Sequence, residues 1–152
     1  MKLIMLGTGN ALVTNCYNTC FVFENQNQYF LVDGGGGNTL LSQLEKAHIN
    51  CQDIKDIFVT HKHIDHLMGI IWMIRMIGQH MSQGKYQGEV RIYAHKELID
   101  IIMQMVHLVL EAKHTQFINK RIHLIEIQDH DSHMIINHQV TFFDIHSTKT
   151  KQ

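Results

Sequence analysis

The stretch Thr60-His61-Lys62-His63-Ile64-Asp65-His66 decides how the rest of the chain is interpreted. It follows the apolar run Ile57-Phe58-Val59 and places three imidazoles and one carboxylate in an H-x-H-x-D-H pattern. Imidazole nitrogens and carboxylate oxygens, in a set without thiolate, suit zinc, manganese or iron. The stretch therefore predicts a loop that binds divalent metal at the end of a strand.

The spacing of the four side chains predicts how they share the metal. In an extended segment alternate side chains lie on one face, so His61 and His63 can bind the same ion. Asp65 and His66 lie beyond the turn, where the next helix begins, and can reach a second ion. Two such ions would hold a bridging hydroxide at neutral pH and stabilise the charge of a displacement reaction. With Asp65 as the acceptor of a proton from that water, the predicted reaction is hydrolysis of an ester, amide or phosphodiester.

The hydrophobic pattern around the loop predicts one α/β domain. The 152 residues are 45% apolar, which suffices for one core, and no linker or repeat indicates a second domain. The segment 67–79 is apolar nearly all round, so we expect a helix that is buried or lies at an interface. The expected strands are 2–6, 19–23, 29–32, 56–60, 90–94, 121–127, 133–136 and 139–145, and the expected helices are 38–47, 67–79 and 96–112.

Two glycine-rich segments follow expected strands, and each has two interpretations. Gly7-Thr8-Gly9 is either a tight turn or part of an active-site loop. Asp33 precedes the run Gly34–Gly37. Its carboxylate either caps the next helix or orients a metal-ligating histidine by a hydrogen bond.

Composition limits the classes of partner and compartment. The formal net charge of −1 gives no overall basic field for nucleic acid, although a local patch would suffice for RNA. Three cysteines without a C-x-x-C pair predict reduced thiols, as in the cytoplasm. No apolar run approaches the roughly 20 residues that span a bilayer, so no membrane partner is expected. Most of the thirteen histidines are interpreted as structural or exposed, including His107, His114, His130, His133 and His138.

The histidine loop and two flanking motifs resemble the metallo-β-lactamase superfamily. Asp33, in Val32-Asp33-Gly34, matches the family's first motif, the segment 61–66 its second, and His146, after the last expected strand, its third. The opening Leu6-Gly7-Thr8-Gly9 and the pair His146-Ser147 are closer to the ribonuclease Z-like branch than to true β-lactamases.

The resemblance implies a fold and a role for each motif residue. The fold would be part of an αβ/βα sandwich, mostly its N-terminal half: a mixed or antiparallel sheet with flanking helices. His61, His63 and His146 would bind a first zinc ion, and Asp65 and His66 a second. Asp33 would support the loop from behind these ligands.

The family pattern also implies two later ligands that this sequence does not contain. An Asp that bridges both metals and a final His should follow the third motif, but only Ser147–Gln152 follow His146. Residues 1–152 are therefore expected to be a single incomplete domain that binds at most one ion well. Apolar surface left uncovered, including residues 67–77, is expected to drive self-association into a homo-oligomer such as a dimer.

The function expected from the sequence is that of a cytoplasmic metal-dependent hydrolase. The leading hypothesis is a ribonuclease Z-like phosphodiesterase that uses a metal-bound hydroxide, with RNA as a candidate substrate. One alternative is a hydrolase of a small ester, lactone, thioester or cyclic nucleotide. Another is a catalytically silent metal-binding fragment that self-associates. The expected cofactor is zinc, one or two ions, with manganese or iron as alternatives.

Overall fold

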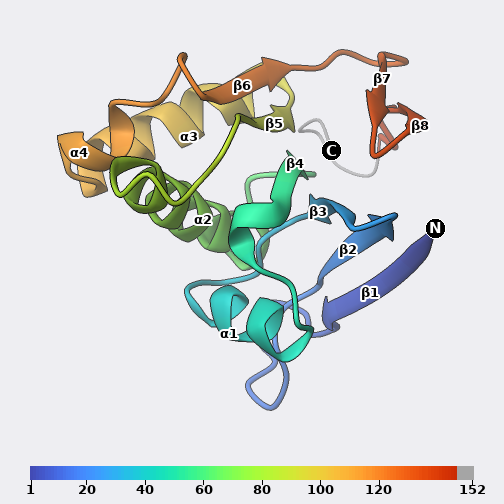
Figure 1. The fold of residues 1–152 in the computed structure, drawn as a ribbon. Coiled ribbons are helices and arrows are strands. Elements are labelled where there is room, and N and C mark those ends of the chain that lie inside the picture. Colours follow the sequence, from blue (N-terminus) through green and yellow to red (C-terminus); the bar gives the residue numbers. More distant parts are fainter. Residues whose placement is uncertain (147–152) are drawn as a thin grey trace.

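The computed structural model describes residues 1–146, and its elements follow the order expected from the sequence (Figure 1). The strands are β1 (Lys2–Gly7), β2 (Cys20–Asn25), β3 (Gln28–Val32), β4 (Ile54–Phe58), β5 (Val90–Ala94), β6 (Ile122–Glu126), β7 (Ser132–Ile135) and β8 (His138–Thr141). The helices are α1 (Thr39–Lys46), α2 (Ile64–Ser82), α3 (Lys96–Val109) and α4 (Ala112–Thr115), with a 3-10 turn, η1 (Cys51–Asp53), before β4.

Six strands form one mixed sheet in the order β1-β2-β3-β4-β5-β6, which confirms the predicted sheet type. The first three strands pair antiparallel, whereas β3, β4, β5 and β6 run parallel. The carboxyl ends of parallel strands meet at one edge of a sheet, where α/β proteins place their sites. Asp33 follows β3 and Thr60 lies just beyond β4, so this topology brings Asp33 and the histidine loop together.

Each face of the sheet has a different cover (Figure 1). The helices cover one face, where Leu31, Ile57 and Ile92 are fully buried in the larger apolar core. The hairpin β7–β8 covers part of the other face, where its Ile135 packs with Phe30 and Tyr93 in a smaller core. The two cores pack against opposite faces of the sheet, and together they fix the edge from which the histidine loop extends.

Helix α2 begins earlier than expected and is more deeply buried. Its first residue is Ile64, not residue 67, so the second half of the H-x-H-x-D-H pattern forms its first turn. The prediction that residues 67–77 leave apolar surface uncovered is wrong, because most apolar side chains of α2 are buried between the sheet and the neighbouring helices. Trp72, at 37% exposed, is the main exception. The exposed large apolar side chains lie mostly elsewhere, among them Leu108, Phe143 and Ile145, and self-association stays a prediction.

Two further boundaries differ from expectation for local reasons. The helix expected over 96–112 ends at Val109, because Leu110 is extended at φ −110° and ψ 146°, and the short α4 follows. The strand expected over 139–145 ends at Thr141, because the Asp131 amide donates to the Gln128 carbonyl and the Phe142 carbonyl accepts from His130 instead, which interrupts the regular β7–β8 ladder. None of the helices in residues 1–146 is both long enough and apolar enough to cross a bilayer.

Candidate metal centre

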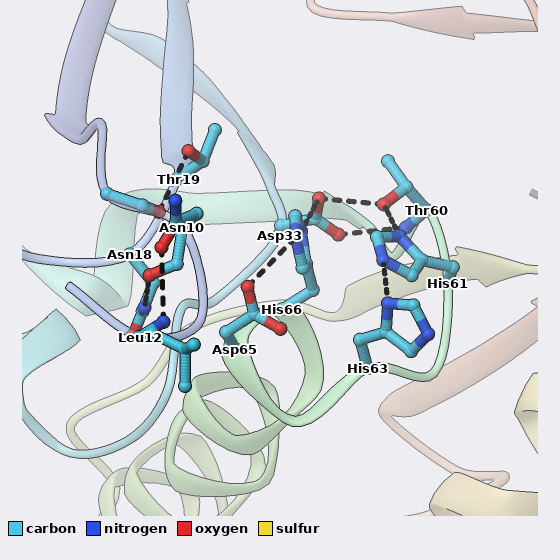
Figure 2. A network of polar contacts seen from close by, with 11 residues as sticks. Asn10, Leu12, Asn18, Thr19, Asp33, Thr60, His61, His63, Asp65 and His66 are labelled. Carbon is cyan, nitrogen blue, oxygen red and sulfur yellow. Dashed lines mark hydrogen bonds and ion pairs between the residues drawn. The ribbon is translucent and has the colours of Figure 1, made fainter.

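The histidine loop joins the end of β4 to the first turn of α2 (Figure 2). His63 is extended, at φ −62° and ψ 145°, and occupies the N-cap position of α2. His61 and His63 therefore lie on the extended part, while Asp65 and His66 lie on the helix. Asp65 is 8% exposed, and its place in the first helical turn is favoured by the helix dipole.

Asp33 lies beneath the loop and accepts three hydrogen bonds from it (Figure 2). The Thr60 amide donates to Oδ1 at 2.8 Å, and the Thr60 hydroxyl donates to Oδ2 at 2.8 Å. Nδ1 of His66 lies 2.8 Å from the same Oδ2. Asp33 is 4% exposed and has a left-handed backbone, at φ 59°, which Asp tolerates better than most residues. A buried carboxylate thus fixes both ends of the loop.

These hydrogen bonds determine which nitrogen of each ring is free. Because Nδ1 of His66 donates to a carboxylate, its Nε2 carries the lone pair. The Thr60 hydroxyl donates its only proton to Asp33, so its oxygen accepts from Nδ1–H of His61 at 2.8 Å. Nε2 of His61 then also carries a lone pair. Both rings present the nitrogen that a metal requires, on the side away from Asp33.

The candidate ligand atoms stand in two pairs at distances that fit a tetrahedral metal, and in the first pair a hydrogen bond from Nδ1–H of His63 to Nε2 of His61 occupies the place that a metal would take. Nε2 of His61 lies 3.0 Å from Nδ1 of His63. Nε2 of His66 lies 3.5 Å from Oδ2 of Asp65. Two ligands of a tetrahedral zinc, each about 2.0–2.1 Å from the ion, are separated by about 3.3 Å. The donor set therefore fits zinc, with His61 and His63 as one edge of a site and Asp65 and His66 as another.

His146 is not joined to either pair. Its side chain is 80% exposed and lies 3.5 Å from Asp144, and its charge also acts on Asp129. Within residues 1–146, no three His, Cys, Asp or Glu side chains already stand in the arrangement of a metal site. The structure thus assembles the expected ligands as pairs, and the part assigned to His146 stays a prediction.

The two half-buried histidines of the loop, His61 and His66, have opposite protonation preferences. Burial, together with the charge of His66, lowers the pKa of His61 below its ordinary value. The hydrogen bond to Asp33 raises the pKa of His66 above its ordinary value. His61 is thus neutral at pH 7, the state in which imidazole binds metal, whereas metal binding at His66 would have to displace a proton more often.

Two residues that support the site were not singled out from the sequence. Thr60 links Asp33 to His61, as described above. Tyr17 lies under the glycine run: its hydroxyl is 2.8 Å from the carbonyls of Gly34 and Gly37, and it accepts from the Gly37 amide at 3.2 Å. Burial raises the pKa of Tyr17 to about 12, so this hydroxyl keeps its proton. A Thr after a strand and a Tyr in a polar loop give no signal in one sequence.

A protein-family model matches the whole chain. Its description is "Anti-Pycsar protein Apyc1", and the match runs over residues 1–152. The chain belongs to the Apyc1 family. Among curated proteins, ribonuclease Z of Methanococcus aeolicus is 35% identical over 79 residues, which cover 51% of this chain and 24% of that protein. The match therefore spans about a quarter of the length of this ribonuclease Z.

Solved structures confirm the fold of this Apyc1 family member. The short form of human tRNase Z is 27% identical with a TM-score of 0.59, covering 71% of this chain and 39% of that one. YhfI of Bacillus subtilis, a metallo-β-lactamase fold protein, is 19% identical with a TM-score of 0.66, covering 96% and 54%. The chain is a ribonuclease Z-like member of the metallo-β-lactamase superfamily, with part of that fold, as the motifs predicted.

Proposed function

We infer that this chain carries the metal-binding half of a metal-dependent phosphodiesterase. The observation that carries the proposal is the pairing of the candidate ligand atoms, His61 with His63 at 3.0 Å and Asp65 with His66 at 3.5 Å. Zinc is the ion that best suits this donor set. The likeness to ribonuclease Z supports a phosphodiester rather than an amide or a lactone as the substrate.

The chain's own residues would act as ligands, supports and a proton acceptor. Asp33 and Thr60 hold the imidazoles of His61 and His66 so that each presents its lone pair before a metal arrives. When bound, the metal would supply Lewis acidity toward the phosphodiester and a nucleophile at neutral pH. One carboxylate oxygen of Asp65 lies 3.5 Å from Nε2 of His66, and we propose that this carboxylate also accepts the proton released by the nucleophile. His146 is proposed to complete the first site.

A small phosphodiester suits the charge around the loop better than RNA does. The loop contributes one cation, Lys62, and its ammonium is paired with Glu97 at 2.6 Å. RNA binding draws most of its affinity from several Lys and Arg side chains on successive phosphates. With a net charge of −1 and this pairing, a nucleotide-sized substrate such as a cyclic nucleotide is favoured over a folded RNA.

The first expected result concerns the metal itself. Protein treated with EDTA should not hydrolyse bis(p-nitrophenyl) phosphate, and adding zinc or manganese should restore turnover. A lactone and a thioester should be hydrolysed far more slowly than the phosphodiester. Metal content by plasma mass spectrometry, measured beside the rates, shows whether activity follows the ion. Full activity in protein that holds no metal would overturn the proposal.

The second expected result concerns Asp33. Asp33→Asn keeps the size of the side chain but removes the charge that holds Nδ1 of His66, and one oxygen that accepts from Thr60. Loss of such a supporting carboxylate weakens metal binding by about 10–100-fold. Competition with a chromogenic chelator measures the zinc affinity. Asp100→Asn, an exposed carboxylate on α3, is the matched control. Equal zinc affinity in the two variants would remove Asp33 from the site.

A further inference from the structure

A cavity of about 540 Å³ opens between α1, the η1 turn and the last turns of α2. Part of its lining is apolar and belongs to the core, with the buried Leu44 and Ile49. Three other lining side chains carry atoms that bind metals: the thiol of Cys51 on η1, and the thioether of Met76 and the imidazole of His80 on α2. None of these three belongs to the histidine loop.

Cys51 and His80 already stand as a pair across the cavity. Sγ of Cys51 lies 3.6 Å from Nδ1 of His80, and both side chains are half-buried. A thiolate sulfur about 2.3 Å from a tetrahedral ion and an imidazole nitrogen about 2.0–2.1 Å from the same ion are about 3.5 Å apart. A metal ion can therefore replace the proton between these two atoms while both residues keep their positions.

Met76 is placed to supply a third ligand to this pair. Met76 and His80 are four residues apart on α2, so their side chains lie on the same face of the helix. The η1 turn, which carries Cys51, packs against α2, and all three side chains line the one cavity. The sulfur of Met76 can thus approach an ion held between Cys51 and His80.

The types of donor favour Cu(I) over zinc. Thiolate and thioether are soft ligands that select Cu(I), and imidazole also suits copper. Zinc is bound by Cys, His, Asp and Glu, and in a structural site it takes four of them. His48 and Glu45 line the same cavity, but within residues 1–146 no third residue of these types stands with Cys51 and His80 in the arrangement of a metal site.

The protonation of the pair argues against a nucleophilic cysteine. Burial raises the pKa of the Cys51 thiol above its ordinary value. Burial, together with the charge of Lys85, lowers the pKa of His80 below its ordinary value. At pH 7 the pair is a thiol beside a neutral imidazole, whereas an activated nucleophile would be a thiolate beside an imidazolium. A metal that binds here displaces the thiol proton and finds the imidazole ready to bind.

We propose that Cys51, Met76 and His80 form a binding site for monovalent copper, separate from the candidate metal centre. His80 follows His66 by fourteen residues of α2, which is about 21 Å along the helix axis. An ion at this site touches neither ligand pair of the histidine loop, so the inference does not depend on the proposed phosphodiesterase function. Because only the folded chain brings Cys51 beside His80, copper binding stabilises the fold.

An anaerobic titration of Cu(I) against bicinchoninate measures the affinity of the site. The wild type should show an ultraviolet thiolate-to-copper absorption band, which the histidine loop cannot produce because it contains no sulfur. Cys51→Ser should abolish the band and weaken binding by more than the about 10–100-fold that loss of a supporting group costs. Met76→Leu should weaken Cu(I) binding about tenfold, the low end of that range, because a thioether is the weakest of the three ligands. Cys16→Ser, which changes an exposed cysteine outside the cavity, is the matched control and should bind as the wild type does.

The melting temperature provides a second readout that does not depend on the variants. One equivalent of Cu(I) should raise the melting temperature of the wild type and of Cys16→Ser, but not that of Cys51→Ser. Copper held at the histidine loop would behave differently, since it would be lost in His63→Ala and kept in Cys51→Ser. The inference is overturned by a wild-type absorption band in Cys51→Ser, by wild-type copper affinity in Met76→Leu, or by a wild-type melting temperature that Cu(I) does not raise.

Discussion

His63→Ala is expected to lower phosphodiester hydrolysis at least about a thousandfold without unfolding the protein. The variant loses the nitrogen that stands 3.0 Å from Nε2 of His61, so one of the two ligand pairs is broken. A thousandfold loss corresponds to about 4 kcal/mol of transition-state stabilisation, the scale expected when metal assistance is removed. His63 is exposed and lies outside the apolar core, so its removal leaves no buried cavity.

The measurement joins rate, metal content and stability. Hydrolysis of bis(p-nitrophenyl) phosphate, zinc per chain and the melting temperature are recorded for wild type, His63→Ala and His107→Ala. His107 is an exposed histidine on α3 that pairs with the Met103 carbonyl, so its variant controls for the loss of one imidazole. Turnover in His63→Ala that equals the wild type would refute the metal mechanism as a whole.

The sequence predicted the ligand loop because its information is local. His61 and His63 share a face of an extended segment, and Asp65 and His66 belong to the first turn of a helix, so spacing alone places them in pairs. The spacing of Asp33, after a strand and before a glycine run, left two roles open, and only the resemblance to the metallo-β-lactamase superfamily favoured support of the loop. The residue type alone shows that these side chains can bind a metal or support a ligand, and the strand and helix periods fix the direction of the side chains.

The supports of the loop were not predictable, because they depend on contacts between distant segments. Thr60 matters through a hydroxyl that reaches a carboxylate 27 residues earlier in the chain. Tyr17 matters because the β1–β2 segment folds over the glycine run, and no periodicity records that approach. The exposure of α2 was mispredicted for the same reason: a helix that is apolar all round is covered or bare depending on its neighbours, and here the sheet and α4 cover it.

The glycine run shows how the fold and the site depend on each other. Gly34 donates its amide to the His66 carbonyl at 2.8 Å, and Gly69 donates its amide to the Gly35 carbonyl at 2.9 Å. The run is thus bonded to the first turns of α2, directly below the ligands Asp65 and His66. Any displacement of the run from α2 must also move Asp33, the residue before it, away from His66.

Gly69→Ala is therefore expected to destabilise the fold and the candidate metal centre together. A carbon added at Gly69 would lie 1.8 Å from the Gly34 carbonyl oxygen, and the Gly34 atoms that it meets are backbone atoms that cannot rotate away. Overpacking of this kind costs about 3 kcal/mol or more, which for a chain of this size lowers the melting temperature by about 10 °C. Because the displaced run carries Asp33 with it, zinc affinity should fall as well.

Gly37→Ala provides the matched control within the same glycine run. A carbon added at Gly37 meets no atom within 4 Å, so its melting temperature should equal that of the wild type or rise slightly. Differential scanning calorimetry and zinc titration of both variants separate the close contact from the general effect of losing a glycine. If Gly69→Ala and Gly37→Ala have the same melting temperature, α2 and the glycine run do not touch as described. If it melts earlier but binds zinc as the wild type does, Asp33 is held by some contact other than the packing of Gly34 on Gly69.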